Sequence, residues 1–295
     1  MQTRRLGPDA PAVSELGYGG MPLSLEERPD EAAAIRTLHA VLDAGVTLID
    51  TADVYCQGPH ELGHNERLIG KALREWSGDR DRLVVATKGG SSRPDAQRWK
   101  ADGRPEHLRE ACEASLENLG VEQIDLYQLH GPDPQVPFED SVGAIAELQR
   151  AGKVRWVGVS NVTVKQLDAA RRIMPVQSVQ NLLNPYFRGA LRGRLWRKGL
   201  LAHCRKLGVG FLAFSPVGGL LAQKTKDHPV LARIAQEHGC SNYRVVLAWL
   251  LAKAPNVIPI PSARSVEHAL DSVAAAELRL SAEQLAAIDA AEFPR

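Results

Sequence analysis

The sequence predicts an α/β fold: a (β/α)8 TIM barrel with an N-terminal β-hairpin and extra helices, occupying residues 1–295 as a single domain. The chain has 295 residues, 44% of them hydrophobic, and a barrel of this kind typically takes roughly 250 residues. Short apolar runs alternate with amphipathic segments along the chain. The alternative, a doubly wound sheet, usually carries a phosphate-binding glycine turn, and neither GxGxxG nor a Walker loop occurs.

Eight short runs rich in Val, Ile and Leu are predicted to be the barrel strands. They are nearly uninterrupted by polar residues, as expected of parallel strands that are buried on both faces. The runs are residues 16–20, 46–50, 82–88, 123–130, 154–160, 175–181, 209–215 and 256–260.

The segments between these runs have apolar residues at helical spacing, and three of them end in a glycine. Glycine is the usual residue at a left-handed helix C-cap. The predicted helices are residues 31–45, 104–120, 139–152, 243–254 and 281–292. Residues 2–15, before the first strand, are expected to form a hairpin that closes the lower end of the barrel.

The charge is balanced, with 36 basic and 35 acidic residues, and no basic block appears, so nucleic acid is not an expected partner. Arg192, Arg194, Arg197 and Lys198 fit the solvated face of a helix. No apolar run approaches the roughly 20 residues that span a bilayer, and the start lacks the apolar region of a signal peptide. The four scattered cysteines form no CxxC pair, so a cytoplasmic location with reduced thiols is expected.

Polar residues follow the predicted strands at their carboxyl ends, where barrels of this class build their active sites. The second strand delivers Asp50, Asp53 and Tyr55, the third Lys88 and the fourth His130. A free tyrosine has a pKa near 10; an adjacent ammonium lowers it, and a carboxylate keeps that ammonium charged. Such a set can protonate a carbonyl oxygen while a hydride arrives at the carbon, with the histidine orienting the oxygen.

Other chemistries also fit parts of this pattern. Lys88 suits a Schiff base of the kind that barrel aldolases form. Cys56, His60 and His64 are regularly spaced, but no fourth ligand is evident, and no metal site is predicted. Ser160 lies in GVSN, which lacks the second glycine of the GxSxG turn of serine hydrolases.

Ordered motifs along nearly the whole chain resemble the aldo-keto reductase superfamily, in particular bacterial members with a short C-terminus. LIDTADVY resembles the strand that ends in the family's catalytic aspartate and tyrosine, VVATKGG the lysine strand and LYQLHGPDP the histidine strand. The resemblance implies that Tyr55 is the general acid, that Lys88 and Asp50 tune it, and that His130 orients the substrate. Asp53 is left without a catalytic task and is interpreted as a loop-capping residue.

VGVSN, SVQNLLNP and FSPVGGLL resemble the cofactor segments of the same family. The resemblance implies NADPH as the cofactor, with Ser160, Asn161 and Gln180 holding the nicotinamide carboxamide. Phe214 is expected to stack on the nicotinamide ring. The remaining implied cofactor contacts are Gly20, Met21, Ser215, Pro216, Val217, Gly218, Gly219, Leu220, Ser262, Arg264, His268, Asp271 and Ser272.

Arg264 is the best partner for the adenosine 2′-phosphate of NADPH, because a guanidinium matches phosphate oxygens. His268 and Ser272 depart from the residues that relatives usually carry at these positions. NADH therefore remains possible as a cofactor.

The polar segment 89–107 follows Lys88, and Trp99 is its only large apolar residue, so Trp99 is hypothesised to contact the substrate. The chain lacks the long C-terminal loop of relatives that reduce steroids and aldoses, which suggests an open pocket. The leading function is NADPH-dependent reduction of aldehyde or ketone carbonyls. A non-catalytic regulator of the same fold and a Schiff-base aldolase remain as alternatives. The physiological substrate and the oligomeric state do not follow from the sequence.

Overall fold

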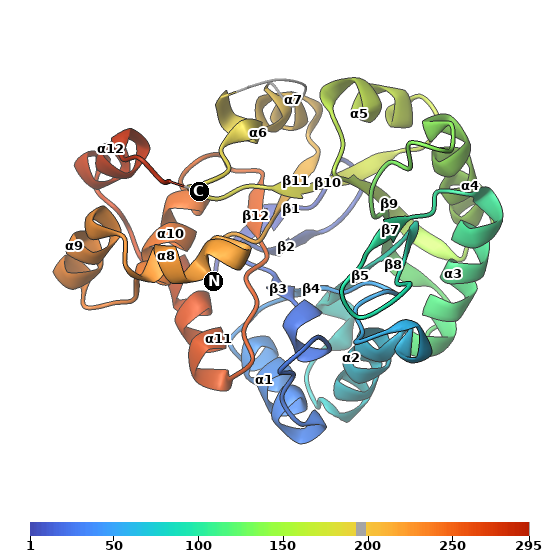
Figure 1. Ribbon diagram of the computed structural model, residues 1–295, viewed down its shortest axis with the longest axis horizontal. Coiled ribbons are helices and arrows are strands. Elements are labelled where there is room, and N and C mark those ends of the chain that lie inside the picture. The colour runs from blue at the N-terminus through green and yellow to red at the C-terminus, as the bar shows by residue number, and fades with distance from the viewer. Residues whose placement is uncertain (193–198, 295) are drawn as a thin grey trace.

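A parallel sheet curls into the barrel, and helices surround it (Figure 1). The computed structural model describes residues 1–192 and 199–294. Within these residues the 8-stranded sheet has the order β12-β11-β10-β9-β8-β5-β4-β3. The amides of Gly17 and Gly19 donate to the carbonyls of Pro259 (2.9 Å) and Pro261 (2.8 Å), which joins the first strand to the last. The barrel strands are β3 Tyr18–Gly19, β4 Leu48–Asp50, β5 Val84–Gly89, β8 Ile124–Leu129, β9 Val154–Ser160, β10 Val176–Leu182, β11 Gly210–Phe214 and β12 Val257–Pro259.

The five helices predicted from the sequence are α1, α3, α4, α10 and α12, and glycines end three of them as expected. Gly120 ends α3 with φ +70°, and its amide donates to the carbonyls of Leu116 and Glu117. Arg194, Arg197 and Lys198 lie outside the described residues. The helices are α1 Glu31–Asp43, α2 His64–Glu75, α3 Pro105–Leu119, α4 Phe138–Arg150, α5 Val164–Arg171, α6 Gly189–Arg192, α7 Leu200–Leu207, α8 Ala222–Lys226, α9 Pro229–His238, α10 Asn242–Leu251, α11 Val266–Val273 and α12 Ala282–Ala290.

The predicted N-terminal hairpin consists of β1 (Thr3–Arg5) and β2 (Ala12–Ser14), which pair antiparallel. Its apolar residues Leu6 and Val13 are fully buried in one cluster with strand residues such as Leu48. The Gly210 amide donates to the Leu6 carbonyl at 3.0 Å. The hairpin therefore seals the barrel end opposite the carboxyl ends of the strands, as the sequence predicts.

Alternation along each strand decides which side chains enter the barrel. Leu48 belongs to the cluster inside the barrel, whereas Ile49 belongs to the larger core between sheet and helices. Successive side chains of a strand point to opposite faces. Asp50 therefore points inward again, at the carboxyl end of β4.

The segment 89–107, expected to be a loop, contains a second small hairpin. β6 (Ser91–Ser92) pairs antiparallel with β7 (Lys100–Ala101), and α3 already begins at Pro105. These two-residue strands are too short and too polar to give a pattern of alternating hydrophobicity, so the sequence does not reveal them.

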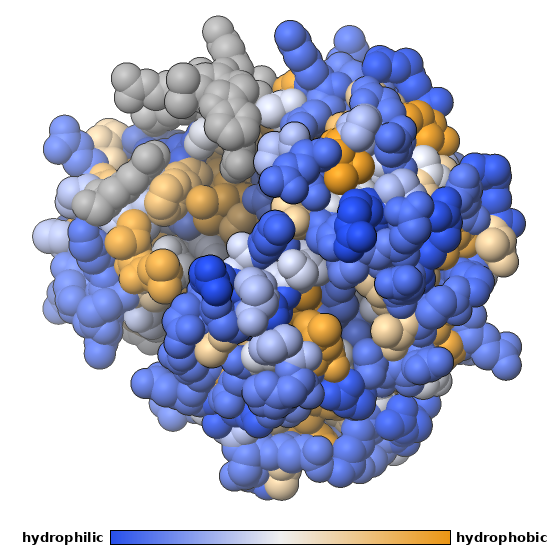
Figure 2. Space-filling model, turned by 45° about the vertical axis from the view of Figure 1, so that its right-hand side comes forward, coloured by the Kyte–Doolittle hydropathy of each residue, from blue (hydrophilic) through white to orange (hydrophobic). Residues whose placement is uncertain are grey.

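The outer surface agrees with the balanced composition. Hydrophilic residues cover most of the face shown in Figure 2, and apolar residues gather there in a few separate patches. Among the described residues, none of the helices combines the length and the apolar character that a membrane span requires.

Candidate active site

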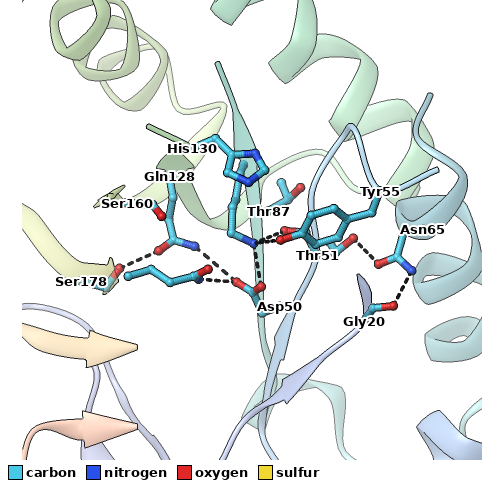
Figure 3. Close-up of polar contacts among 12 residues, drawn as sticks. Gly20, Asp50, Thr51, Tyr55, Asn65, Thr87, Gln128, His130, Ser160 and Ser178 are labelled. Carbon is cyan, nitrogen blue, oxygen red and sulfur yellow. Dashed lines mark hydrogen bonds and ion pairs between the residues drawn. The ribbon is translucent and has the colours of Figure 1, made fainter. Parts of the chain in front are cut away.

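A buried polar cluster lies at the carboxyl ends of β4 and β5, where Figure 3 shows Asp50, Thr51 and Tyr55 close together, and Lys88 is its centre. Its Nζ donates to Asp50 Oδ1 at 2.6 Å, to the Thr51 carbonyl at 2.7 Å and to Tyr55 Oη at 3.0 Å. The lysine is completely buried, and Asp50 is nearly so. An ammonium has three N–H donors, so these contacts use all of them.

The charge state of Lys88 follows from this pairing. Burial by itself lowers the pKa of Lys88, but Asp50 and Tyr55 outweigh burial and raise the pKa above its ordinary value. The side chain is therefore an ammonium at neutral pH, without the free lone pair that a Schiff base needs. The charged state of Lys88 therefore argues against the alternative function as a Schiff-base aldolase.

Tyr55 holds its proton at neutral pH. Burial raises the pKa of Tyr55 above its ordinary value of 10.0, and the Lys88 charge offsets only part of that rise. The expected lowering by an ammonium is thus present but smaller than the effect of burial. The phenol is a protonated donor at the cavity wall.

The second oxygen of Asp50 is held by two side-chain amides, one from β10 and one from β8. Gln180 Nε2 donates to Asp50 Oδ2 at 2.6 Å, and Gln128 Nε2 lies 3.5 Å from the same oxygen. Ser178 Oγ in turn donates to Gln128 Oε1 at 3.3 Å. Gln180, predicted as a nicotinamide contact, is therefore also a partner of the carboxylate, and Gln128 is a site residue that was not predicted.

Asn65, on α2, is a second residue that was not predicted. Thr51 Oγ1 donates to Asn65 Oδ1 at 2.6 Å, while Asn65 Nδ2 donates to the Gly20 carbonyl (2.8 Å) and to Ser24 Oγ (2.7 Å). A Cβ on Gly20 would lie 2.6 Å from Asn65 Oδ1, so this position favours glycine. The contacts tie the segment that carries Met21 to the end of β4 (Figure 3).

A cavity of about 240 Å³ opens above this cluster. It brings together three of the four predicted catalytic side chains, while Lys88 lies beneath them. Trp99 also lines it: its side chain is 41% exposed, and its ring centroid is 5.9 Å from that of Tyr55 and 6.4 Å from that of His130. The lining residues are Gly19, Met21, Asp50, Tyr55, Trp99, His130, Ser160, Asn161, Gln180, Phe214, Ser215, Ile260 and Ser262.

His130 is neutral in this setting. Burial, with a smaller contribution from the Lys88 charge, lowers the pKa of His130 to about 3. Its Nδ1 is buried and has no hydrogen-bond partner within the part of the chain that the structure describes. A neutral imidazole carries one N–H, which it can donate to an oxygen in the cavity.

Two cavity residues have left-handed backbones, which are uncommon for side chains other than glycine. Asn161 has φ +57° after β9, and Ser215 has φ +48° after β11. The Asn161 amide donates to the Gln180 carbonyl at 3.0 Å, and Asn184 Nδ2 donates to the Ser215 carbonyl at 2.9 Å. Such strain persists only where the surroundings hold it, and it concentrates at functional sites.

The glycines predicted to lie along a pyrophosphate form a turn beyond the cavity lining. Gly218 and Gly219 have φ +113° and +59°, which only glycine adopts readily. Leu220 beside them is fully exposed. Pro216 and Val217 connect this turn to Ser215.

The residues predicted to contact the adenosine lie at α11. Arg264 precedes the helix; its Nη1 contacts Glu27 Oε2 at 3.0 Å, and its Nη2 donates to the Glu26 carbonyl at 2.9 Å. Within the helix, the His268 amide donates to the N-cap oxygen of Ser265, and Ser272 Oγ donates to the His268 carbonyl.

Asp271 faces α10 instead of the cavity. Its carboxylate contacts Arg244 Nη2 at 2.6 Å and accepts from Ser241 Oγ at 2.5 Å. The structure therefore commits this predicted cofactor residue to an intramolecular ion pair.

The segment around Tyr55 holds further groups that are buried or partly buried. Asp53 is 8% exposed; burial, with an added contribution from Glu66, raises the pKa of Asp53 well above its ordinary range. Cys56 Sγ lies 3.2 Å from the Gly58 carbonyl, and His64 Nδ1 lies 2.8 Å from Ser24 Oγ. Cys56 and His64 therefore both contact other groups of the protein itself.

Known proteins match this chain over nearly its whole length. A model of the aldo/keto reductase family matches residues 15–292. The chain belongs to the aldo/keto reductase family. It is 36% identical to an uncharacterized oxidoreductase of Schizosaccharomyces pombe, over 94% of this chain and 86% of that protein. It is 32% identical to the aldo-keto reductase Str7 of Strobilurus tenacellus, over 98% and 91%.

Solved structures of aldo-keto reductases share the fold. The thermostable Tm1743, in complex with the inhibitor epalrestat, is 33% identical with a TM-score of 0.81, covering 98% of this chain and 99% of that chain. An aldo-keto reductase of Klebsiella pneumoniae in complex with NADPH is 28% identical with a TM-score of 0.80, covering 98% and 95%. Aldo/keto reductases are NAD(P)H-dependent oxidoreductases, and this family member is an enzyme of that class.

Proposed function

We propose that this aldo/keto reductase uses NADPH to reduce the carbonyl group of a small aldehyde or ketone to an alcohol. The observation that carries the proposal is the protonated Tyr55, 3.0 Å from a lysine that Asp50 keeps charged, at the wall of a cavity. We further propose that residues 1–295 act as one unit in the cytoplasm, which the four free cysteines support.

The cavity fits a nicotinamide cofactor. Ser160, Asn161 and Gln180 present polar groups at the ends of neighbouring strands, and Phe214 offers a flat apolar face beside them. The Gly218–Gly219 turn allows close approach of a pyrophosphate. We assign these residues to hold NADPH, which when bound supplies a hydride to the carbonyl carbon.

The chain's own residues supply the proton. Tyr55 donates its hydroxyl proton to the carbonyl oxygen as negative charge develops there, and the Lys88 ammonium stabilises the resulting phenolate. Asp50 keeps Lys88 charged. Neutral His130 donates an N–H to the same oxygen and so orients the substrate.

Because His130 is neutral, we expect kcat to show no inflection near pH 6.5, the ordinary pKa of histidine. The pKa of about 3 places its protonation below the working range. The folded pKa lies below the unfolded one, so the stability that neutral His130 contributes is present above pH 6.5 and is lost as the pH falls toward 3. Turnover measured between about pH 5 and 8 checks this. An inflection near 6.5 that disappears in His130→Gln contradicts it.

Arg264 is expected to distinguish NADPH from NADH. Its contact with Glu27 is solvent-exposed and contributes about 0–1 kcal/mol, so a phosphate can replace it. We expect Arg264→Ala to weaken NADPH binding about tenfold, roughly the contribution of one charge-assisted hydrogen bond, and NADH binding much less. Dissociation constants from cofactor fluorescence measure both. If Arg264→Ala weakens the binding of NADPH and NADH equally, this role is contradicted. Glu27→Ala, which removes the carboxylate that Arg264 contacts, is the variant to compare with it.

NADPH oxidation in the presence of simple aldehydes and ketones tests the proposed function directly. Substrate-dependent oxidation, with the alcohol as product, supports it. A chain that binds NADPH but oxidises none of a broad carbonyl panel is instead a regulator of the same fold. Trapping of a substrate on Lys88 by borohydride, without need of a nicotinamide, indicates the aldolase.

A further inference from the structure

Two adjacent side chains in the first turn of α2, Asn65 and Glu66, bond to threonines at the ends of β4 and β5. Thr51 Oγ1 donates to Asn65 Oδ1 at 2.6 Å, and Thr87 Oγ1 donates to Glu66 Oε1 at 2.6 Å. All four side chains are completely buried. Water therefore does not compete for these two hydrogen bonds.

The two threonines are the sequence neighbours of the buried ion pair. Thr51 follows Asp50, and Thr87 precedes Lys88. Asp50 and Lys88 meet on the barrel side of the sheet, and successive side chains of a strand point to opposite faces. The threonines therefore face the surrounding helices, and Figure 3 shows Thr51 turned toward Asn65.

Backbone pairing between β4 and β5 ends before it reaches Lys88. The last pair of the ladder is Asp50 with Ala86, and the Thr51 amide donates to the Ala86 carbonyl at 2.8 Å. Beyond this point the Asp53 amide is 3.4 Å from the Lys88 carbonyl, which is long for a hydrogen bond. The side-chain bonds to α2 thus hold the two chain segments together where the ladder stops.

The first turn of α2 uses its polar side chains for the strands instead of for its own end. The N-cap is Gly63, which has no side chain to cap the helix. A glutamate at the third helical position commonly bonds back to the N-cap amide. Here that amide donates to the Asp53 carbonyl at 2.7 Å, and Glu66 accepts from Thr87. Burying a carboxyl group is unfavourable unless its oxygens are bonded, and Asn118 Nδ2 donates to the second oxygen at 3.3 Å.

We propose that Asn65 and Glu66 are positioning residues, which through the two threonines hold Lys88 in place beneath the cavity. This inference rests on the proposed carbonyl reduction. Proton donation by Tyr55 requires the ammonium at hydrogen-bond distance, and a displacement of about 1 Å can lower a rate roughly 10²-fold. Asn65 has a second task, because its Nδ2 donates to the Gly20 carbonyl at 2.8 Å and so holds a segment that lines the cavity.

Thr51→Val and Thr87→Val test the proposal, because valine has nearly the shape of threonine and lacks the hydroxyl. We expect each variant to lower kcat on the order of 10- to 100-fold, while the dissociation constant of NADPH changes little. Thr51→Ser and Thr87→Ser, which keep the hydroxyl, should recover most of the lost kcat. Asn65→Ala is expected to lower kcat and also to weaken NADPH binding, because it releases Gly20. Turnover at saturating aldehyde and cofactor fluorescence titration measure the two effects separately.

Thr37→Val is the matched control, because it removes a buried hydroxyl that donates to the Ala33 carbonyl within α1, and kcat should not change. The proposal is overturned if the valine variants at Thr51 and Thr87 keep the kcat of the wild type. It is also overturned if the serine variants lose as much kcat as the valine variants. Both results leave the proposed function intact, whereas a wild-type enzyme that reduces no carbonyl compound overturns both.

Asn118→Ala covers the case in which the valine variants do not fold. Asn118 is only partly buried, and its removal leaves both threonine bonds in place but takes one donor away from Glu66. We expect kcat to fall severalfold, less than in the valine variants, and NADPH binding to stay the same. A kcat equal to that of the wild type contradicts the positioning role of Glu66.

Discussion

Tyr55→Phe is expected to lower kcat for carbonyl reduction by about 10²–10⁴-fold, the contribution of a positioned general acid. The hydroxyl 3.0 Å from Lys88 Nζ is the protonated group that the cluster presents to the cavity. The change removes only that hydroxyl, so NADPH binding should change little. Stopped-flow turnover and cofactor fluorescence titration measure the two effects separately.

Tyr127→Phe is the matched control, because it removes the hydroxyl of a fully buried tyrosine on β8 whose Oη lies 3.4 Å from the Leu108 carbonyl. This variant should turn over nearly as fast as the wild type. If Tyr55→Phe also retains near-wild-type turnover, another group donates the proton, and the proposed mechanism fails.

Lys88→Met is expected to lower the free energy of unfolding by about 3–5 kcal/mol and to lower kcat severely. Removing one partner of a buried ion pair leaves an uncompensated charge, here that of Asp50. The pKa of Lys88 is raised on folding, so this stabilisation is complete below about pH 10.4, the unfolded value, and is lost as the pH rises through the folded pKa. Urea unfolding near neutral pH measures the difference.

The double variant Lys88→Met/Asp50→Asn separates stability from catalysis. With both charges removed, a large part of the lost stability should return, while turnover should stay low. Lys153→Met removes a lysine from an exposed pair with Glu113 and should cost about 0–1 kcal/mol. Equal unfolding curves for Lys88→Met and the wild type rule out a stabilising role for the buried pair.

Long apolar runs allowed the fold to be predicted element by element. β9 occupies 154–160, the predicted range, because its run is continuous and follows a glycine-terminated helix. β4 is shorter than its run, because the Thr47 amide donates to Ser14 Oγ and Thr47 Oγ1 accepts from the Ser14 amide. Near the predicted start of this strand, Thr47 is therefore bonded to Ser14 of the N-terminal hairpin. A contact between segments so far apart cannot be predicted from local sequence.

Side chains with distinctive chemistry, such as Tyr55 and Lys88, were predicted to belong to the site, whereas the amides of Gln128 and Asn65 were not. The alternation of inward positions on β8 places Gln128 two residues before His130 on the same face of the strand, so the sequence did contain a signal for it. Asn65 had no such signal, because it lies outside the barrel strands and its role depends on neighbours that folding brings to it.

By itself, the sequence determined the barrel, the order of its strands and the acidic, basic and phenolic groups at their ends. Strand periodicity and side-chain chemistry are local properties, and the carboxyl ends of parallel strands meet at one edge. Only the tertiary structure decided that burial keeps Tyr55 protonated although the Lys88 charge acts to lower its pKa, and that Asn65 ties Gly20 to the end of β4. Desolvation and pairing depend on segments far apart in the chain, so these features exist only once the chain has folded.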